Sequence, residues 1–95
     1  MKININGISY EVKMVDEPDE SNSDVVGQFH IQNQTIKIKK GMGKEFTEYT
    51  IIHEIMHGIY DSLSFEQDEE TIDPIARSLY SVIKSNPQFF KSILK

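Results

Sequence analysis

The chain has 95 residues and a net charge of -5, with 10 Lys and Arg against 15 Asp and Glu, and it contains no Cys and no Trp. The length predicts a single domain, residues 1–95, with a small core. The lack of cysteine excludes a disulfide scaffold, a Cys-ligated zinc site and thiol chemistry, so any metal ion must be held by His and carboxylate side chains.

The acidic balance also narrows the partners. Nucleic-acid-binding proteins present a basic surface, and this chain offers only a short lysine-rich stretch that we interpret as a solvated strand end and loop. Its members are Lys37, Lys39, Lys40 and Lys44. No apolar run approaches the roughly 18 residues of a membrane span, and the alternating N-terminus is unlike a secretory signal. We therefore expect an acidic, soluble, cytoplasmic protein with no nucleic-acid or membrane partner.

Two hairpins are predicted in the first half of the chain. Residues 3–13 alternate apolar and polar side chains around Asn6-Gly7, a strong two-residue turn signal. Residues 16–24 are acidic and contain a proline, which predicts a surface loop. A second alternating pair of segments occupies residues 29–39. Together they predict a short antiparallel sheet.

Three helices are predicted to follow. From about Lys44 to Tyr60 apolar residues recur at spacings of three and four and extend around much of the circumference, which is typical of a central helix. The next helix begins after Asp68, a good N-cap, and ends at Asn86-Pro87. Its expected buried stripe is Ile72, Ile75, Ala76, Leu79 and Ile83. Residues 88–94 are expected to close the core, with docking of a partner as the alternative. Strands followed by helices predict the α+β class.

The central helix carries the motif His53-Glu54-Ile55-Met56-His57. Histidines at i and i+4 lie on the same helix face, about 6 Å apart along the axis, and can converge on one Zn²⁺. Glu54 would project beside the ion and take a proton from a zinc-bound water. His53 and His57 are therefore predicted metal ligands, and Glu54 is the predicted general base.

Such a site needs a third protein ligand. Asp61 is disfavoured because it is i+8 from His53, about 12 Å along one helix. The metzincin pattern requires Gly and His where this chain has Tyr60 and Leu63. His30, on a predicted strand, is interpreted as an ordinary strand residue.

The acidic start of the following helix offers a better ligand. Glu69 and Asp73 are i and i+4 and flank the stripe that must face the central helix. We choose Glu69 as the third ligand and expect Asp73 to accept a hydrogen bond from a ligand imidazole. Glu70 points toward solvent in this register, but it remains an alternative because the first turn can slip. Ala76 would let the two helices approach closely.

Together, His53-Glu54-Ile55-Met56-His57 and Glu69-x-x-x-Asp73-x-Ile75-Ala76 resemble the gluzincin pattern of thermolysin-like peptidases. The stretch from Glu69 to Pro87 is similar to small phage and prophage HExxH proteins related to the ImmA/IrrE metallopeptidases. The resemblance implies a minimal zincin-like fold with one zinc ion. It also implies an edge strand that pairs with extended substrate, for which Gln34–Lys40 is the candidate.

The chain departs from the large gluzincins in two ways. The spacing from His57 to Glu69 is much shorter, which leaves Glu69, Glu70 and Asp73 open as the third ligand. No second domain supplies an oxyanion-stabilising side chain. The tyrosines near the expected site are Tyr49, Tyr60 and Tyr80, and each is read first as a core residue.

Three functions are consistent with the sequence. The leading hypothesis is a zinc metallopeptidase acting on a protein or peptide, with a phage or prophage context implied by the resemblance. The alternative is a non-catalytic, zinc-stabilised binding or regulatory domain, because a small core benefits from a metal. The third is an interaction module that uses the apolar C-terminal tail. Substrate identity and oligomeric state stay open.

Overall fold

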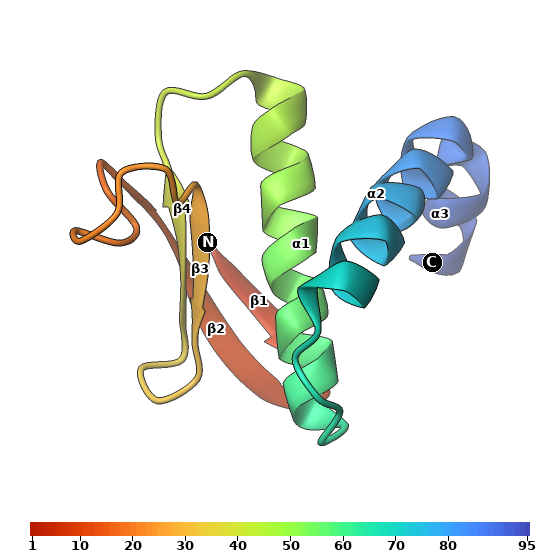
Figure 1. The fold of residues 1–95 in the computed structure, drawn as a ribbon. Helices are drawn as coiled ribbons and strands as arrows, with labels where there is room; N and C mark the ends of the chain where they lie inside the picture. The colour runs from red at the N-terminus through yellow and green to blue at the C-terminus, as the bar shows by residue number, and fades with distance from the viewer.

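The computed structural model describes residues 1–95 and confirms the α+β class, with strands leading and helices following (Figure 1). The strands are β1 (Lys2–Ile5), β2 (Ile8–Val15), β3 (Gly27–His30) and β4 (Thr35–Lys39). The helices are α1 (Lys44–Ser62), α2 (Glu69–Ser85) and α3 (Pro87–Ile93). Helix α1 stands between the sheet on one side and α2 with α3 on the other. The prediction of a central helix is thereby confirmed.

Both predicted hairpins are present, but the strands that pair between them, β2 and β4, run parallel. The strand order is β1-β2-β4-β3, and the central pair β2–β4 runs parallel, with Glu11 opposite Thr35 and Val15 opposite Lys39. The prediction of an antiparallel sheet is therefore wrong, because the sheet is mixed. A turn signal fixes pairing within a hairpin, whereas the long 16–24 loop lets the second hairpin enter the sheet by its later strand.

The same topology corrects the predicted edge strand. β4, which contains most of Gln34–Lys40, lies inside the sheet between β2 and β3. The edge strand beside Glu54 is instead β3, which pairs only with β4. β3 lies close to the motif helix, as the surroundings of Gly27 show: a Cβ added there would be 2.7 Å from Thr50 Cγ2 and 2.9 Å from Glu54 Oε2.

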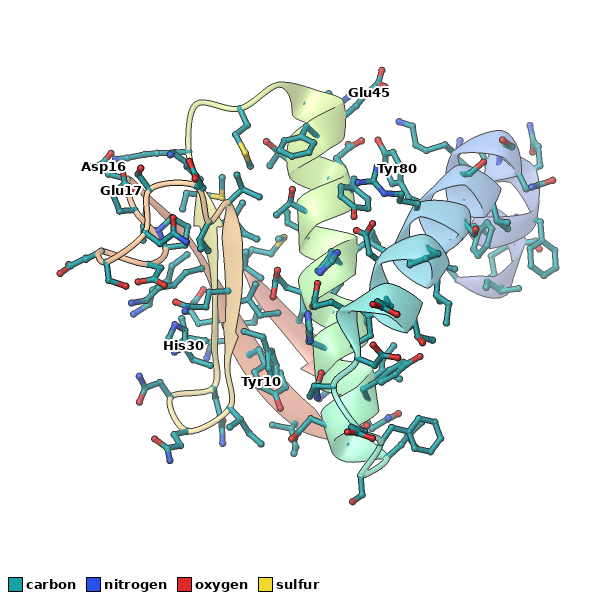
Figure 2. The ribbon with its side chains drawn as sticks, in the orientation of Figure 1. Tyr10, Asp16, Glu17, His30, Glu45 and Tyr80 are labelled. Atoms are coloured by element: carbon teal, nitrogen blue, oxygen red, sulfur yellow. The ribbon has the colours of Figure 1, made fainter.

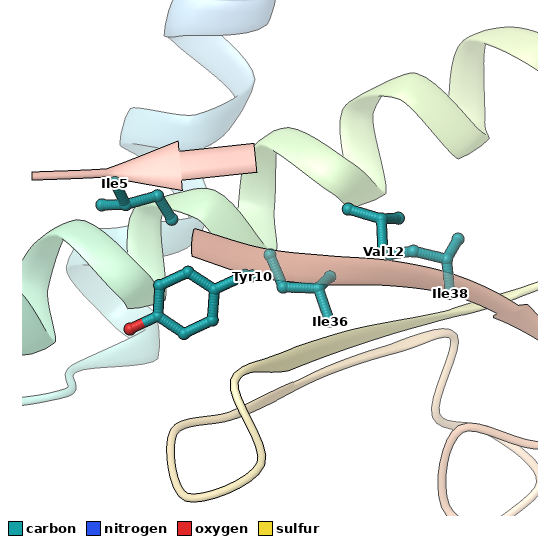
Figure 3. Close-up of a cluster of buried hydrophobic side chains, with 5 residues drawn as sticks. All are labelled: Ile5, Tyr10, Val12, Ile36 and Ile38. Carbon is teal, nitrogen blue, oxygen red and sulfur yellow. The ribbon is translucent and has the colours of Figure 1, made fainter. Parts of the chain in front are cut away.

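The main core lies between the sheet and α1. Its five buried side chains all come from the inner face of the sheet (Figure 3), and they are Ile5, Tyr10, Val12, Ile36 and Ile38. Ile51 and Ile55 of α1 pack against them. Gly58 allows this approach, since a Cβ there would be 2.6 Å from Ile5 Cδ1.

A second, smaller core joins α1 to α2. It consists of Met56, Ile72 and Ala76, and the last two side chains are completely buried. Ala76 is thus at the helix contact, as expected. Ile75 is not, because it is 40% exposed and lies at the border of the stripe.

A polar contact also joins the two helices. Figure 2 shows Tyr80 of α2 reaching toward α1, where its hydroxyl donates to Glu48 at 2.8 Å.

The C-terminal tail does not close the core. Helix α3 contacts only α2 and has no buried residue, with Phe89 60% and Leu94 83% exposed. The prediction failed because α2 leads away from the sheet and carries α3 with it (Figure 1). None of the three helices has the length and apolar character needed to cross a membrane.

Candidate metal centre

The two motif histidines lie side by side on the face of α1 that is turned toward the start of α2. Their ring centroids are 5.2 Å apart, and their side chains are only 14% and 17% exposed. This arrangement follows from the helical period, which places residues i and i+4 on one face. The Nε2 atoms of His53 and His57 both face the beginning of α2.

The start of α2 brings Glu69 to these two nitrogens. Asp68 caps the helix as predicted, since its carboxylate accepts the Glu70 backbone N–H at 3.1 Å, and this fixes where the first turn begins. Glu69 Oε2 lies 3.1 Å from His53 Nε2, and Glu69 Oε1 contacts His57 Nε2. One ligand atom from each of the three residues lies within 4.8 Å of the other two.

This donor set fits a divalent metal ion. Ligand atoms about 2.0–2.1 Å from zinc in a tetrahedral site are roughly 3.3 Å from one another, close to the separation of Glu69 and His53 here. The Glu69 side chain is 61% exposed, so the open side of the group faces solvent. His53, His57 and Glu69 are therefore a group that could hold a metal ion.

The far side of the His53 ring meets the predicted supporting carboxylate. Asp73 Oδ1 lies 3.2 Å from His53 Nδ1, and it also accepts a hydrogen bond from the Tyr49 hydroxyl. Arg77 Nε donates to Asp73 Oδ2 at 2.9 Å. These two hydrogen bonds lower the pKa of Asp73, and burial with the Asp73 contact raises the pKa of Tyr49 to about 12. Asp73 thus stays anionic behind His53, where it favours a proton on Nδ1 and leaves Nε2 free for a metal.

His57 has a corresponding partner that sequence reasoning missed. Gln67 Oε1 lies 2.7 Å from His57 Nδ1, and Gln67 Nε2 donates to the His57 carbonyl oxygen at 3.1 Å. Since an amide oxygen accepts only, the Gln67 contact places the proton on Nδ1 of His57. Gln67 is in the short connection between α1 and α2, where no sequence pattern distinguishes it from its neighbours.

Glu54 lies beside the histidines but outside the ligand group. Glu54 is 6% exposed and lies against β3, and its carboxylate forms no hydrogen bond or salt bridge within the chain. Burial raises the pKa of Glu54, while His57 and His53 lower it in part and Glu69 adds to the rise. A carboxylate with a raised pKa next to two imidazoles is suited to accept and return a proton.

A cleft runs along this face between β3 and the start of α2. Its main part has a volume of about 480 Å³ and is lined by the two histidines, Glu54, Glu69 and residues of β3. A second part of about 270 Å³ continues past Gly27 toward Phe46 and Arg77. Glu54 lines both parts, so it lies at the middle of the cleft.

The other residues considered from the sequence are not part of the ligand group. His30, labelled in Figure 2 on β3, bonds Gln28 Oε1 through Nε2 at 2.7 Å. Glu70 is exposed, and Asp61 lines the cleft without joining the group. Tyr49 is engaged at the Nδ1 side of His53, and Tyr80 at Glu48. Tyr60 packs edge-on against Phe65 instead of lining the cleft.

Comparisons of the chain with protein-family models, with curated proteins and with solved structures returned no match. The assignment of a function therefore depends on the geometry of the site.

Proposed function

We propose that this protein is a zinc-dependent metallopeptidase. The observation that carries the proposal is the placement of Glu54, a residue only 6% exposed whose carboxylate forms no bond within the chain, beside the His53–His57–Glu69 group and in the lining of an open cleft. A purely structural metal site needs its ligands only, and it gains nothing from a second, buried acid at its side. A hydrolytic site needs one.

A zinc ion bound here would polarise a peptide carbonyl and make a water molecule more acidic near neutral pH. His53, His57 and Glu69 would hold it, while Asp73 and Gln67 orient the two imidazoles. Glu54 would accept the proton of the attacking water and deliver it to the leaving amine. Because Gly27 has no side chain, the backbone of β3 lies directly beside Glu54, where an extended peptide could pair with the strand.

A substitution of Glu54 tests this proposal. Purified protein should contain about one zinc per chain and cleave peptides in a proteome-derived peptide mixture. Glu54→Gln should keep the zinc and lose turnover by about 10²–10⁴-fold, the usual contribution of a general base. Glu66→Gln is the matched control, because Glu66 is exposed in the connection between α1 and α2 and its side chain forms no hydrogen bond or salt bridge. Equal turnover in wild type and Glu54→Gln, or no bound zinc, would refute the proposal.

One observation favours the second candidate, a non-catalytic zinc-stabilised domain. Only 13 of 95 residues are buried, and α2 is held to α1 by a core of three, so a metal joining Glu69 to α1 would reinforce a weak contact. Under this alternative zinc removal lowers the melting temperature, yet Glu54→Gln changes nothing and no peptide is cleaved. The phage or prophage context stays a prediction from the resemblance.

A further inference from the structure

The lining of the main cleft contains three carboxylates and neither Lys nor Arg. They belong to Glu54, Asp61 and Glu69. Glu69 belongs to the candidate metal group and Glu54 to its proposed chemistry, whereas Asp61 has no part in either. Asp61 is half-buried, so its carboxylate is open to a ligand that enters the cleft.

Asp61 lies at one end of the cleft. Helix α1 and strand β3 run in the same direction there, because Gly27 lies against Thr50 and Glu54 while Phe29 lies against Gly58. The end of α1 and the residue that follows β3, Ile31, therefore lie toward the same end of the cleft, and Ile31 lines the cleft and is half exposed. This end offers an apolar surface beside an acidic group.

The Asp61 carboxylate is unpaired in the folded chain. It forms no salt bridge, and its side chain takes part in no hydrogen bond. The ionisable group that it does affect is the phenol of Tyr10, whose pKa is raised by burial and then by the charge of Asp61. No cation of this chain neutralises it.

The opposite end of the cleft has a different character. Arg77 lines it together with Phe46, and its guanidinium is already bonded to Asp73 and stacked over the Tyr49 ring at 4.7 Å. Asp73 also lines this part, where Arg77 balances its charge, so the carboxylates without a basic partner lie in the main part of the cleft with Asp61. Glu54, which is 6% exposed and forms no hydrogen bond or salt bridge within the chain, lines the same cavity, which supports the role of this cavity in ligand binding.

We propose that Asp61 is a specificity-determining residue that binds a positively charged group of the peptide substrate at the Ile31 end of the cleft. The inference rests on the proposed function for the identity of the ligand as a peptide. The group is either a Lys or Arg side chain, whose methylene stem would cover Ile31, or a free amino terminus. A charge-assisted hydrogen bond to Asp61 then selects such peptides over neutral ones of the same shape.

Peptide binding tests this assignment without relying on turnover. The protein is the zinc-loaded Glu54→Gln variant, and the probes are acetylated nonapeptides with a single Lys or a single norleucine at each position in turn. A third set has a free amino terminus and norleucine throughout. We expect one Lys position, or the free amine, to strengthen binding about tenfold over norleucine. Which set gains identifies the source of the charge.

Substitutions at Asp61 must then remove the preference. Adding Asp61→Asn should bring the Lys-to-norleucine ratio close to one, and Asp61→Arg should favour the corresponding Glu peptide. Asp24→Asn is the control, since Asp24 is exposed, does not line the cleft and has a carboxylate that forms no hydrogen bond or salt bridge. Equal binding of Lys and norleucine peptides, or a preference that survives Asp61→Asn, would overturn the assignment. Failure of the wild type to cleave the peptides that it binds would count against the peptidase instead and leave the preference intact.

Discussion

The contact between β3 and α1 should be intolerant of a single methyl group at Gly27. In Gly27→Ala the new Cβ would be 2.7 Å from Thr50 Cγ2 and 2.9 Å from Glu54 Oε2, so each neighbour must move by about half an ångström or more. Thr50 cannot yield easily, because it is buried and its hydroxyl donates to the Phe46 carbonyl at 2.7 Å. The Gly27 backbone itself is not strained, as its φ lies outside the left-handed region.

The magnitude follows from two opposing effects. Overpacking of this kind costs about 1–3 kcal/mol, and replacing Gly by Ala returns about 0.4–1 kcal/mol through the unfolded chain. We expect a net loss of about 1–2 kcal/mol out of a total of about 5–15 kcal/mol for a domain of this size. For a chain of this length each kcal/mol lowers the melting temperature by about 4–8 °C. Peptide turnover should fall further than stability explains, because Glu54 is displaced.

Urea and thermal unfolding of zinc-loaded protein measure the loss, and zinc content is followed in parallel. Gly43→Ala is the matched control, since a Cβ there has nothing within 4 Å and the residue has φ -59. The control should change stability by less than about 1 kcal/mol, the scale of an N-cap effect. If Gly27→Ala is as stable and as active as Gly43→Ala, then β3 does not approach α1 as described and the geometry around Glu54 is wrong.

Two further substitutions test the support of the site and of the helix pair. Gln67→Ala should weaken zinc binding about 10–100-fold, measured in competition with a chromophoric chelator. The control is Gln32→Ala, in the exposed β3–β4 turn, which should leave the zinc affinity unchanged. Equal zinc affinities of the two variants would mean that Gln67 does not orient His57. Tyr80→Phe removes the hydrogen bond to Glu48; this bond, with the charge of Lys84, holds the pKa of the Glu48 carboxyl below its usual value. A carboxyl whose pKa is lower in the folded state than in the unfolded state stabilises the protein at pH values above the unfolded-state pKa, and this stabilisation is lost as the pH falls through the folded-state pKa. The urea midpoint of the wild type should therefore exceed that of Tyr80→Phe at pH 7, and the difference should shrink in acid. A gap independent of pH would contradict this role of Glu48.

The features that the sequence predicted correctly are local ones. The i, i+4 spacing of His53 and His57 needs only a helix to place both rings on one face, and Asp68 needs only its own side chain to begin α2. The helix start and the buried stripe also predicted that Glu69 would face α1, and the structure places it beside the two histidines, whereas the choice of metal ligand between Glu69, Glu70 and Asp73 stays a prediction. The Asn6-Gly7 turn likewise depends on its own backbone, with φ of 49° and 92°.

Contacts between distant segments were not predictable in the same way. Nothing within either hairpin specifies that β2 pairs with β4 in parallel, so both the mixed sheet and the identity of the edge strand depended on how the hairpins pack. Gln67 became a partner of His57 only when the connection folded back over α1. Gly27 and Gly58 read as ordinary glycines until the sheet and the helix were seen to touch there.

The sequence by itself determined the helix and strand segments, the pair of histidines, the adjacent acid and the acidic cap of the next helix, because periodicity and capping act within one or two turns of chain. Only the tertiary structure decided that β3 borders the cleft, that the unpaired Asp61 lies at one end of this cleft and that α3 lies outside the core. Those outcomes depend on which helix and strand faces pack together although long loops separate them in the sequence. The free energy of that packing depends on shape complementarity between distant segments, which no local sequence pattern reveals.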